Sequence, residues 1–349
     1  MKENILLLFG GQSSEHGVSL KSATTIYQNI DEDAYEIYPV GITKEGRWML
    51  YRGANFDFTN NKWEEKGVPC ILSPDATHKG LILLREEQEI VKVRIDKVFP
   101  ILHGKYGEDG TIQGLCKLAQ IPYVGCGVAS SAISMDKAFT KVVVKDAGVP
   151  QADFVVVRER ELKQLDEVVQ KIEEAFGYPY FIKPANAGSS FGISKATDQT
   201  SLKRGLLEAA KHDTKIIVEE TIVGREVETA VLGNEDIVVS GVGEILAAAD
   251  FYDYDAKYNN AESKTIVSAN LPVDIAQKIR ELAKVVYRAV DAKGLSRVDF
   301  FVTEQGEIIF NEINTMPGFT PISMYPMLFE AAGIDTQELV TRLIKLASL

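Results

Sequence analysis

The residues best suited to chemistry lie in two strand-like segments near the C-terminus, SRVDFF and IIFNEIN. Side chains alternate between the two faces of a strand, so Glu312 and Asn314 share one face. If the QG between the segments forms a two-residue hairpin turn, Asp299 lies opposite Glu312, and Arg297 lies opposite Asn314. Directly opposed side chains have Cβ atoms roughly 4.5 to 5.5 Å apart. The spacing therefore predicts one face that carries two carboxylates, an amide and a guanidinium.

This face has the composition of a site for a hard metal ion. Two carboxylates at that separation repel each other by about 4 kcal/mol at an effective dielectric constant near 20, unless a proton or a cation lies between them. Asp299, Glu312 and Asn314 offer only oxygen ligands, which favours Mg²⁺ (or Mn²⁺) completed by waters and phosphates. The alternative is an ordinary solvated hairpin face, on which polar residues also alternate.

A second candidate site is the small-residue loop AGSSFG, which follows a strand-like YFIKP that ends near Lys183. Glycines let backbone N–H groups approach phosphate oxygens, and the lysine can neutralise the same phosphates. A plain hairpin turn is the alternative. The loop also matches the G-x-S-x-G pattern of serine hydrolases, but that motif needs a helix after the turn, whereas ISKAT is typical of a strand. No Walker A motif is present, so a nucleotide is expected between strands.

Length and composition narrow the class of protein. The 349 residues exceed the size of a single core, and no apolar run reaches the ~20 residues that span a bilayer, so we expect two or three domains and no membrane segment. A net charge of −12 argues against a nucleic-acid surface. The three cysteines lack the spacing of a disulfide framework or a zinc site, and the N-terminal apolar run is too short for a signal peptide. A cytoplasmic protein is expected.

The order of the predicted elements suggests how these sites are positioned. The first ~125 residues alternate short apolar runs with helical patterns, which indicates a mostly parallel sheet with helices on its faces. Ligands bind such sheets at the carboxyl ends of strands, where GGQSSEHG and HGKYGEDG fall. A helical segment then begins near Ser131 and ends at Gly148. It is followed by the strand-like runs FVVV, YFIKP and IIVEE.

The C-terminal part opens with REVETAVLG and continues into a polar, Tyr-rich segment, FYDYDAKYNNAESK, which we expect to form an ordered surface loop. Apolar residues at helical spacing predict a long helix over 274–291. The fold class is therefore a multidomain mixture of α/β and α+β. We expect an N-terminal α/β domain over 1–128, a central domain over 129–219 and a C-terminal domain over 220–349.

Taken together, these motifs resemble a known family. In order, GGQSSEHGVSL, HGKYGEDGTIQG, SMDK, FIKPANAGSSFGIS, IIVEETIVGREVE, FYDYDAKY, SRVDFF and FNEINTMPGFTPISMYP resemble the D-alanine:D-alanine ligases of the ATP-grasp superfamily, over nearly the whole chain. The resemblance implies an N-terminal α/β domain followed by a two-part ATP-grasp fold with ATP between its two antiparallel sheets. It also implies that ATP phosphorylates one D-alanine, and that the amine of a second D-alanine attacks the acyl phosphate during peptidoglycan synthesis.

The resemblance assigns the nucleotide site residue by residue. Lys137 and Lys183 would hold the ATP phosphates, with help from Lys257. Glu219 would lie along the adenine, and Glu226 would bind the ribose hydroxyls. The same comparison makes the hairpin residues the magnesium ligands, namely Asp299, Glu312 and Asn314.

The resemblance also assigns the amino-acid subsites. Glu15 would bind the ammonium group of the first D-alanine, oriented through hydrogen bonds with Ser189 and Tyr258, and the Tyr258 loop would be a lid that excludes water. Read alone, Glu15 is equally a carboxylate that caps a helix. Arg297 and the backbone N–H of Gly318 would stabilise the oxyanion of the tetrahedral intermediate.

The second D-alanine would be bound through its carboxylate by Ser323 and the backbone of Met324, beside His103 and Glu108. Relatives in this family join D-alanine to D-serine or D-lactate instead. The Tyr-containing lid motif argues for an amine nucleophile, whereas D-serine is harder to exclude, because one hydroxyl in a small pocket gives little discrimination. A non-catalytic nucleotide-binding protein is the alternative from another class. The resemblance further suggests a homodimer.

Overall fold

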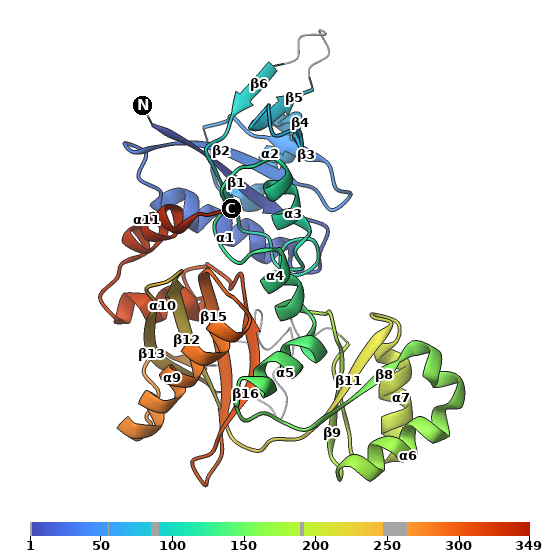
Figure 1. Ribbon diagram of the computed structural model, residues 1–349. Coiled ribbons are helices and arrows are strands. Elements are labelled where there is room, and N and C mark those ends of the chain that lie inside the picture. Colours follow the sequence, from blue (N-terminus) through green and yellow to red (C-terminus); the bar gives the residue numbers. More distant parts are fainter. Residues whose placement is uncertain (1, 55, 85–90, 189–191, 247–263) are drawn as a thin grey trace.

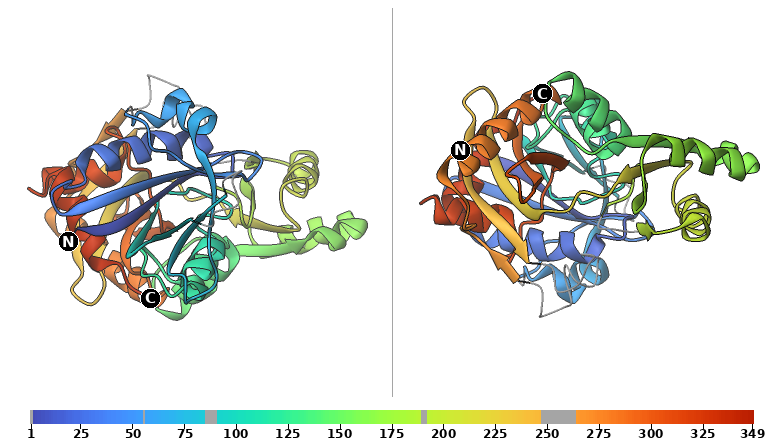
Figure 2. Two further views of the ribbon diagram at one scale, coloured as in Figure 1. Left: turned by 90° about the horizontal axis from the view of Figure 1, so that it is seen from above. Right: turned by 90° about the horizontal axis from the view of Figure 1, so that it is seen from below.

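The computed structural model describes residues 2–54, 56–84, 91–188, 192–246 and 264–349. Three sheets organise the chain, and the one formed by residues 154–220 projects to one side of the molecule (Figures 1 and 2). The expected loop over FYDYDAKYNNAESK, with Lys257 and Tyr258, lies outside the described residues, as does Ser189. Among the described residues, no helix is long and apolar enough to cross a membrane.

The N-terminal sheet has the strand order β6-β5-β4-β3-β2-β1-β7. Its parallel part, which was predicted, consists of β1 (Glu3–Gly10), β2 (Tyr35–Ile42) and β7 (Lys97–Pro100). The expectation of a mostly parallel sheet fails beyond β2, where the strands form an antiparallel meander because short connections join them. These strands are β3 (Trp48–Leu50), β4 (Val68–Leu72), β5 (Gly80–Leu83) and β6 (Val91–Arg94).

The helices of this part are short apart from the first. They are α1 (His16–Asn29), the 3₁₀ turn η1 (Phe58–Asn60), α2 (Lys62–Lys66) and α3 (Thr111–Leu118). The loops after β1 and β7 meet at the carboxyl ends of these two parallel strands, as the sequence predicted. There, the hydroxyl of Ser13 donates a hydrogen bond to the carbonyl oxygen of His103 at 2.7 Å. The sheet therefore presents two polar loops at one edge.

The middle of the chain begins with two helices, α4 (Val128–Met135) and α5 (Lys137–Asp146), which meet at Asp136. The Asp136 side chain accepts hydrogen bonds from the backbone N–H groups of Ala138 and Phe139, and it thereby caps the start of α5. Helix α5 is followed by Gly148 with φ +77°, a conformation that favours glycine.

An antiparallel sheet with the order β10-β9-β11-β8 follows, covered by α6 and α7. Because β9 and β10 are paired antiparallel, the loop between them leads into a strand and does not form the strand-turn-helix of a hydrolase. The elements are β8 (Phe154–Arg158), η2 (Glu159–Gln164), α6 (Leu165–Ala175), β9 (Tyr180–Pro184), β10 (Ser194–Ala196), α7 (Gln199–Ala209) and β11 (Lys215–Glu220).

The C-terminal sheet has the order β14-β13-β12-β15-β16 and carries the predicted hairpin. Helix α9 (Val273–Ala289) packs on it through Ile279 and Val286, which confirms the helix expected over 274–291. The strands are β12 (Arg225–Gly233), β13 (Val238–Leu246), β14 (Lys264–Ile266), β15 (Gly294–Val302) and β16 (Ile308–Asn314). The chain ends with α10 (Met324–Ala331) and α11 (Thr336–Leu346).

The hairpin turn differs from the predicted one. The N–H of Thr303 donates to the carbonyl of Glu307 at 3.0 Å, and the N–H of Gly306 donates to the carbonyl of Thr303 at 2.9 Å. The loop therefore has three residues rather than two, and Gly306 supplies its left-handed conformation at φ +79°. Above this loop, Phe300 pairs with Phe310.

A β-bulge at Asn311 then shifts the register by one residue. As a result, Asp299 lies opposite Glu312, and Arg297 lies opposite Asn314, so both predicted pairs are confirmed. The longer turn and the bulge cancel each other at the functional end of the hairpin.

The end of the chain returns to the N-terminal sheet. Leu339 and Leu343 of α11 are fully buried in one core with Leu7 and Ile26. Ser348 also pairs with Tyr123 beside β7. The N-terminal and C-terminal parts of the chain therefore share a core, which fixes their loops relative to each other.

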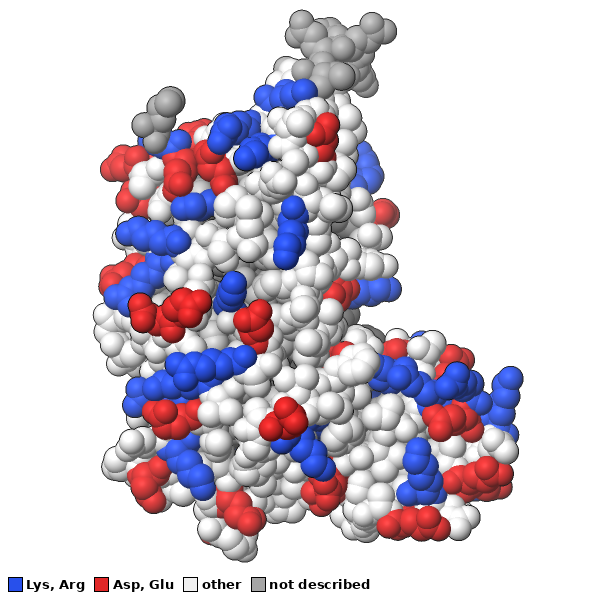
Figure 3. All heavy atoms as spheres, viewed as in Figure 1, with Lys and Arg blue, Asp and Glu red and all other residues white. Residues whose placement is uncertain are grey.

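Surface charge and the cysteines complete the description of the fold. On the face seen in Figure 3, the Lys and Arg side chains of the described residues are interspersed with Asp and Glu side chains. Cys70, Cys116 and Cys126 are all buried and free. Burial raises the pKa of the Cys70 and Cys116 thiols to about 12, so both stay protonated.

Candidate active site

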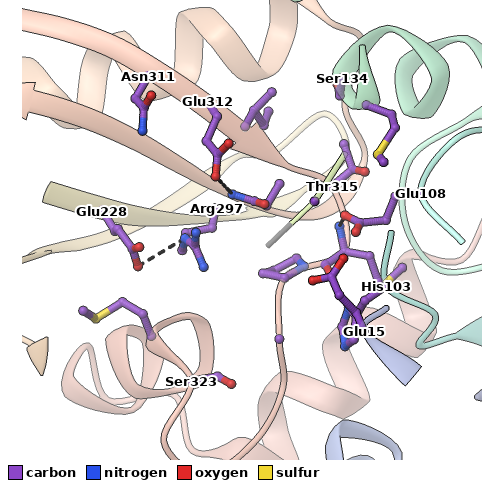
Figure 4. Close-up of a pocket in the computed structure, with 18 of the residues that line it drawn as sticks. Glu15, His103, Glu108, Ser134, Glu228, Arg297, Asn311, Glu312, Thr315 and Ser323 are labelled. Carbon is purple, nitrogen blue, oxygen red and sulfur yellow. Dashed lines mark hydrogen bonds and ion pairs between the residues drawn. The ribbon is translucent and has the colours of Figure 1, made fainter. Parts of the chain in front are cut away.

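A cavity lies where the N-terminal loops, α4 and α5, and the C-terminal sheet meet (Figure 4). Glu15 lines it from the start of α1, Lys137 from α5, and Arg297 and Glu312 from the hairpin. Ser323, just before α10, closes the opposite side. Acidic, basic and hydroxyl groups from distant parts of the sequence therefore face one space.

Glu15 occupies a narrow place between two glycine backbones. A Cβ atom added to Gly104 would lie 2.6 Å from Oε2 of Glu15, and one added to Gly188 would lie 2.5 Å from the same atom. Glu15 is 8% exposed, and it precedes α1 without forming a side-chain cap. The helix-capping interpretation is therefore wrong. The two glycines make room for this carboxylate to reach the cavity.

Glu108 lies beside Glu15 and has an unusual environment. Burial and the neighbouring Glu15 raise the pKa of Glu108 to about 8. Its two carboxyl oxygens accept hydrogen bonds from the N–H of Gly104 at 2.8 Å and the N–H of Met316 at 2.9 Å. The group is therefore largely protonated at neutral pH.

His103 belongs to a chain of hydrogen bonds that reaches the loop after β16. Its Nδ1 lies 2.8 Å from the Met316 carbonyl, which can only accept, so Nδ1 carries the proton. Its Nε2 lies 3.1 Å from the hydroxyl of Ser22, which accepts from the N–H of Phe319 at 3.0 Å. Burial lowers the pKa of His103, consistent with a neutral ring. This chain holds the backbone on both sides of Gly318.

Arg297 lies in a row of charged side chains that crosses three strands. Glu228 on β12 pairs with Asp299 on β15, which pairs with Glu312 on β16. The guanidinium of Arg297 lies 3.1 Å from Glu228 and donates two hydrogen bonds to Asp299 at 2.7 and 2.8 Å. Burial lowers the pKa of Arg297, but Asp299 and Glu228 outweigh burial and raise it well above its usual value. The residue is a permanent cation.

The predicted metal ligands converge on this row. Nδ2 of Asn314 lies 3.2 Å from Asp299 and 3.4 Å from Glu312, so all three side chains end within hydrogen-bonding distance. Their oxygen-rich composition fits a hard divalent cation. Within the described part of the chain, no three His, Cys, Asp or Glu side chains form such a cluster by themselves. In this structure, Arg297 and the Asn314 amide offset the repulsion between the two acids.

The residues predicted to bind the nucleotide form a second charged group. Nζ of Lys137 donates to the carbonyl of Ala187 at 2.7 Å, so this lysine reaches the small-residue loop. Lys183 lies 2.5 Å from Glu219, and Lys141 lies 2.9 Å from the other carboxylate oxygen. Burial alone would raise the pKa of Glu219, but the two lysines lower it to about 2. In the structure, Lys183 thus pairs with a protein carboxylate.

The remaining predicted subsite lies where α10 begins. The hydroxyl of Ser323 accepts a hydrogen bond from the N–H of Thr320 at 3.0 Å, and it lies beside Gly318. The next residue, Met324, is buried and lines the cavity. Ser323 and Gly318 therefore lie next to each other on one side of the cavity.

Most of the predicted site residues meet in the cavity, namely Glu15, His103, Glu108, Lys137, Arg297, Glu312, Asn314, Gly318, Ser323 and Met324. Asp299 joins them through Arg297, and Glu226 lies on β12 two positions before Glu228. Sequence reasoning missed Glu228 and Lys141. The alternation of the two acids in REVETA, and the one-turn spacing of the two lysines in KAFTK, were the available signals.

Comparison with known proteins finds matching families and relatives over nearly the whole chain. The family described as "D-ala D-ala ligase N-terminus" matches residues 4–126, and the family described as "D-ala D-ala ligase C-terminus" matches residues 143–345. A D-alanine–D-alanine ligase of Acetivibrio thermocellus is 49% identical over 99% of this chain and 96% of its own. One from Caldicellulosiruptor bescii is 48% identical over 99% of this chain and 95% of its own.

Solved structures show the same fold. The VanG D-Ala:D-Ser ligase from Enterococcus faecalis superposes with a TM-score of 0.91 at 40% identity, covering 99% of both chains. The D-alanine-D-alanine ligase from Coxiella burnetii has a TM-score of 0.85 at 33% identity, covering 99% of this chain and 95% of its own. The similarity extends over all three sheets.

Proposed function

The chain belongs to the D-alanine–D-alanine ligase family, and from that premise we propose how its cavity joins two D-alanines with ATP to give D-alanyl-D-alanine for cell-wall synthesis. The observation that carries this proposal is the meeting of Glu15, Arg297, Glu312, Gly318 and Ser323 in one cavity. These groups can bind an ammonium group, an oxyanion, a cation and a carboxylate side by side.

In the first step, a carboxylate oxygen of one D-alanine attacks the γ-phosphorus of ATP, and ADP leaves. Lys137 and Lys183 bind the phosphates, with Lys257, while Glu219 contacts the adenine and Glu226 the ribose. Charge neutralisation by lysines lowers the repulsion between the substrate carboxylate and the triphosphate. The product is D-alanyl phosphate.

Asp299, Glu312 and Asn314 would hold the Mg²⁺ (or Mn²⁺) that accompanies ATP. When bound, such an ion screens the phosphate charges. In the structure, the guanidinium of Arg297 is paired with Asp299. Asp299 would therefore be shared between this guanidinium and the bound cation. The carboxylates must be ionised to serve as ligands.

Glu15 binds the ammonium group of the first D-alanine, which fixes the orientation of its carboxylate. We assign Ser189 and Tyr258 the role of orienting Glu15, and the loop around Tyr258 the role of a lid. Excluding water matters at this stage because an acyl phosphate hydrolyses readily.

In the second step, the amine of the second D-alanine attacks the acyl carbon. A C–N bond forms, the nitrogen gives up a proton, and phosphate leaves with the electrons of the C–O bond as the tetrahedral intermediate collapses. Arg297 and the N–H of Gly318 stabilise the oxyanion. Ser323 and the Met324 backbone bind the carboxylate of the attacking substrate.

His103 and Glu108 border this second subsite. His103 donates a hydrogen bond to the carbonyl of Met316, and Glu108 accepts one from its N–H. We assign them the role of setting the position of the Gly318 N–H, two residues further along the chain. The proton retained by Glu108 at neutral pH limits the negative charge beside Glu15.

The direct test is mass spectrometry of products after incubation with ATP, Mg²⁺ and equal amounts of D-alanine, D-serine and D-lactate. Predominant D-alanyl-D-alanine is the expected result. A mixed product with D-serine would align the chain with the activity named for the Enterococcus faecalis structure. No condensed product, with ATP bound, would favour a non-catalytic nucleotide-binding protein.

We expect a homodimer in the cytoplasm, where ATP is available. The expectation of a dimer comes from the family resemblance. Size-exclusion chromatography with light scattering measures the mass in solution, and a value near that of one 38.5 kDa chain would contradict it.

A further inference from the structure

Three ionic side chains, two buried and one partly buried, meet where α5, β9 and β11 come together. Oε1 of Glu219 lies 2.9 Å from Lys141, and its Oε2 lies 2.5 Å from Lys183. The Lys141 side chain is 3% exposed, the Glu219 side chain 7% and the Lys183 side chain 15%. One carboxylate therefore has two ammonium partners, one on each oxygen.

The two lysines and one glutamate carry a net charge of +1. Burying an unbalanced charge costs free energy unless another anion lies nearby. Glu312 and Glu226 also attract Lys183. Together with Glu219 they outweigh burial and raise its pKa, so it stays charged. Lys183 lies one residue before the end of β9 and is the more exposed of the two lysines. It is therefore the ammonium group that can turn towards an incoming phosphate.

Lys141, by contrast, is fixed in place. It lies one helical turn after Lys137 on α5, whose start is capped by Asp136. Its backbone carbonyl accepts a hydrogen bond from Gln151 at 2.8 Å, and its ammonium group lies 3.5 Å from the carbonyl oxygen of Ala152. Lys141 is thus the lysine that can stay paired with Glu219, because several contacts fix its position.

We propose that Lys141 is a positioning residue for nucleotide binding, which keeps Glu219 ionised and oriented while Lys183 exchanges Glu219 for a nucleotide phosphate. The proposal rests on the nucleotide roles of Lys183 and Glu219 given above and adds a role for Lys141. Without Lys141, the exchange would leave a buried carboxylate with no cation, which costs several kcal/mol. Glu219 would then take up a proton or keep Lys183.

The test uses three variants of the full chain. Lys141→Met keeps the length of the side chain but removes the charge, Lys141→Arg keeps the charge, and Lys145→Met is a matched control on an exposed position of the same helix. The KM for ATP and kcat are measured from pH 5 to 9 for each protein. Thermal unfolding confirms that each variant is folded.

For Lys141→Met, we expect the KM for ATP to rise about tenfold, a typical loss when a group that orients a binding residue is removed, with kcat changed much less. Its kcat/KM for ATP should also decrease on the acid side of this pH range, where the wild type keeps its value, because a buried Glu219 with one lysine fewer is easier to protonate. Lys141→Arg and Lys145→Met should keep the wild-type pH profile.

A second measurement separates positioning from a general loss of packing. In a Glu219→Gln background, no carboxylate remains to be held, so adding Lys141→Met should not shift the pH profile further. An unshifted profile in the folded Lys141→Met single variant, or an equal shift in both backgrounds, would overturn the proposal. If Lys141→Met does not fold, loss of the wild-type profile in Lys141→Arg would overturn it. Failure of the wild type to make a dipeptide would instead count against the proposed function.

Discussion

The carboxyl group of Glu108 accepts a hydrogen bond from the N–H of Met316, a residue 208 positions away. The contact joins the loop after β7 to the loop after β16. His103 binds the carbonyl of the same residue, so both ends of Met316 are fixed by the N-terminal loop. Gly318 follows on the same segment, and its backbone N–H is the proposed oxyanion donor. The loop after β7 therefore holds the segment of the C-terminal part that carries the proposed oxyanion donor.

The first prediction concerns this contact. Glu108→Ala should lower kcat by about 100-fold, because a shift of about 1 Å in a catalytic group can cost that much. The KM for ATP should change little, since the nucleotide-side residues lie elsewhere. Steady-state kinetics with varied ATP and D-alanine measure both. The exposed Glu330→Ala on α10 is the control, and wild-type kcat in folded Glu108→Ala would contradict the role.

The second prediction concerns the metal site. Asp299→Asn and Glu312→Gln should each abolish turnover while the protein remains folded, because each removes an ionised ligand for the divalent ion. If either variant keeps some activity, the Mg²⁺ concentration that gives half-maximal ADP release should be higher than for the wild type. Glu304→Gln, at the exposed tip of the same hairpin, should leave both values unchanged. Near-normal activity in both ligand variants would rule out this assignment.

The third prediction separates the charge of Arg297 from its shape. Arg297→Lys keeps a cation but cannot contact Glu228 and donate two hydrogen bonds to Asp299 at once. We expect kcat to fall about 100-fold, within the range seen when one oxyanion donor is lost. Single-turnover measurements should locate the loss in dipeptide formation. An unchanged rate of dipeptide formation would show that the positive charge of the side chain, and not the shape of the guanidinium, is what this step requires.

Much of this site was predictable because local patterns determined it. Alternation placed Glu312 and Asn314 on one face, and their pairing with Asp299 and Arg297 was confirmed. That success involved two compensating differences, since the turn is one residue longer than predicted and Asn311 forms a bulge. Neither feature has a strong local signal, because both depend on how the hairpin packs against its neighbours.

The contacts that were not predictable link residues far apart in the sequence. Lys141 is one of many lysines in the chain, and only the tertiary fold brings this residue of α5 to Glu219 of β11. The antiparallel meander β3–β6 was also missed, because alternating apolar runs do not reveal which way each strand runs. The lid around Tyr258 lies outside the described residues, so its role stays a prediction.

The fourth prediction concerns acid stability and Glu219. Its pKa falls from the usual 4.5 to about 2 in the folded protein, through Lys183 and Lys141, which outweigh the opposing effect of burial. A depressed pKa contributes stability that is fully present above about pH 4.5 and is lost as the pH falls towards 2. The size of this shift corresponds to about 3 kcal/mol. Glu219→Gln should therefore unfold several degrees below the wild type at neutral pH.

The diagnostic result is how the difference in unfolding temperature between Glu219→Gln and the wild type depends on pH. This difference should stay constant between about pH 7 and pH 5 and shrink below about pH 4, where the wild-type carboxylate is itself protonated. Thermal unfolding of both proteins in matched buffers measures it, and Glu220→Gln provides a neighbouring control for the loss of one charge. Because Glu219 pairs with two lysines, its protonation leaves both without their shared partner, just as the amide does. A difference that stays constant down to the acid limit would mean that Glu219 stabilises the fold through shape and not through its charge.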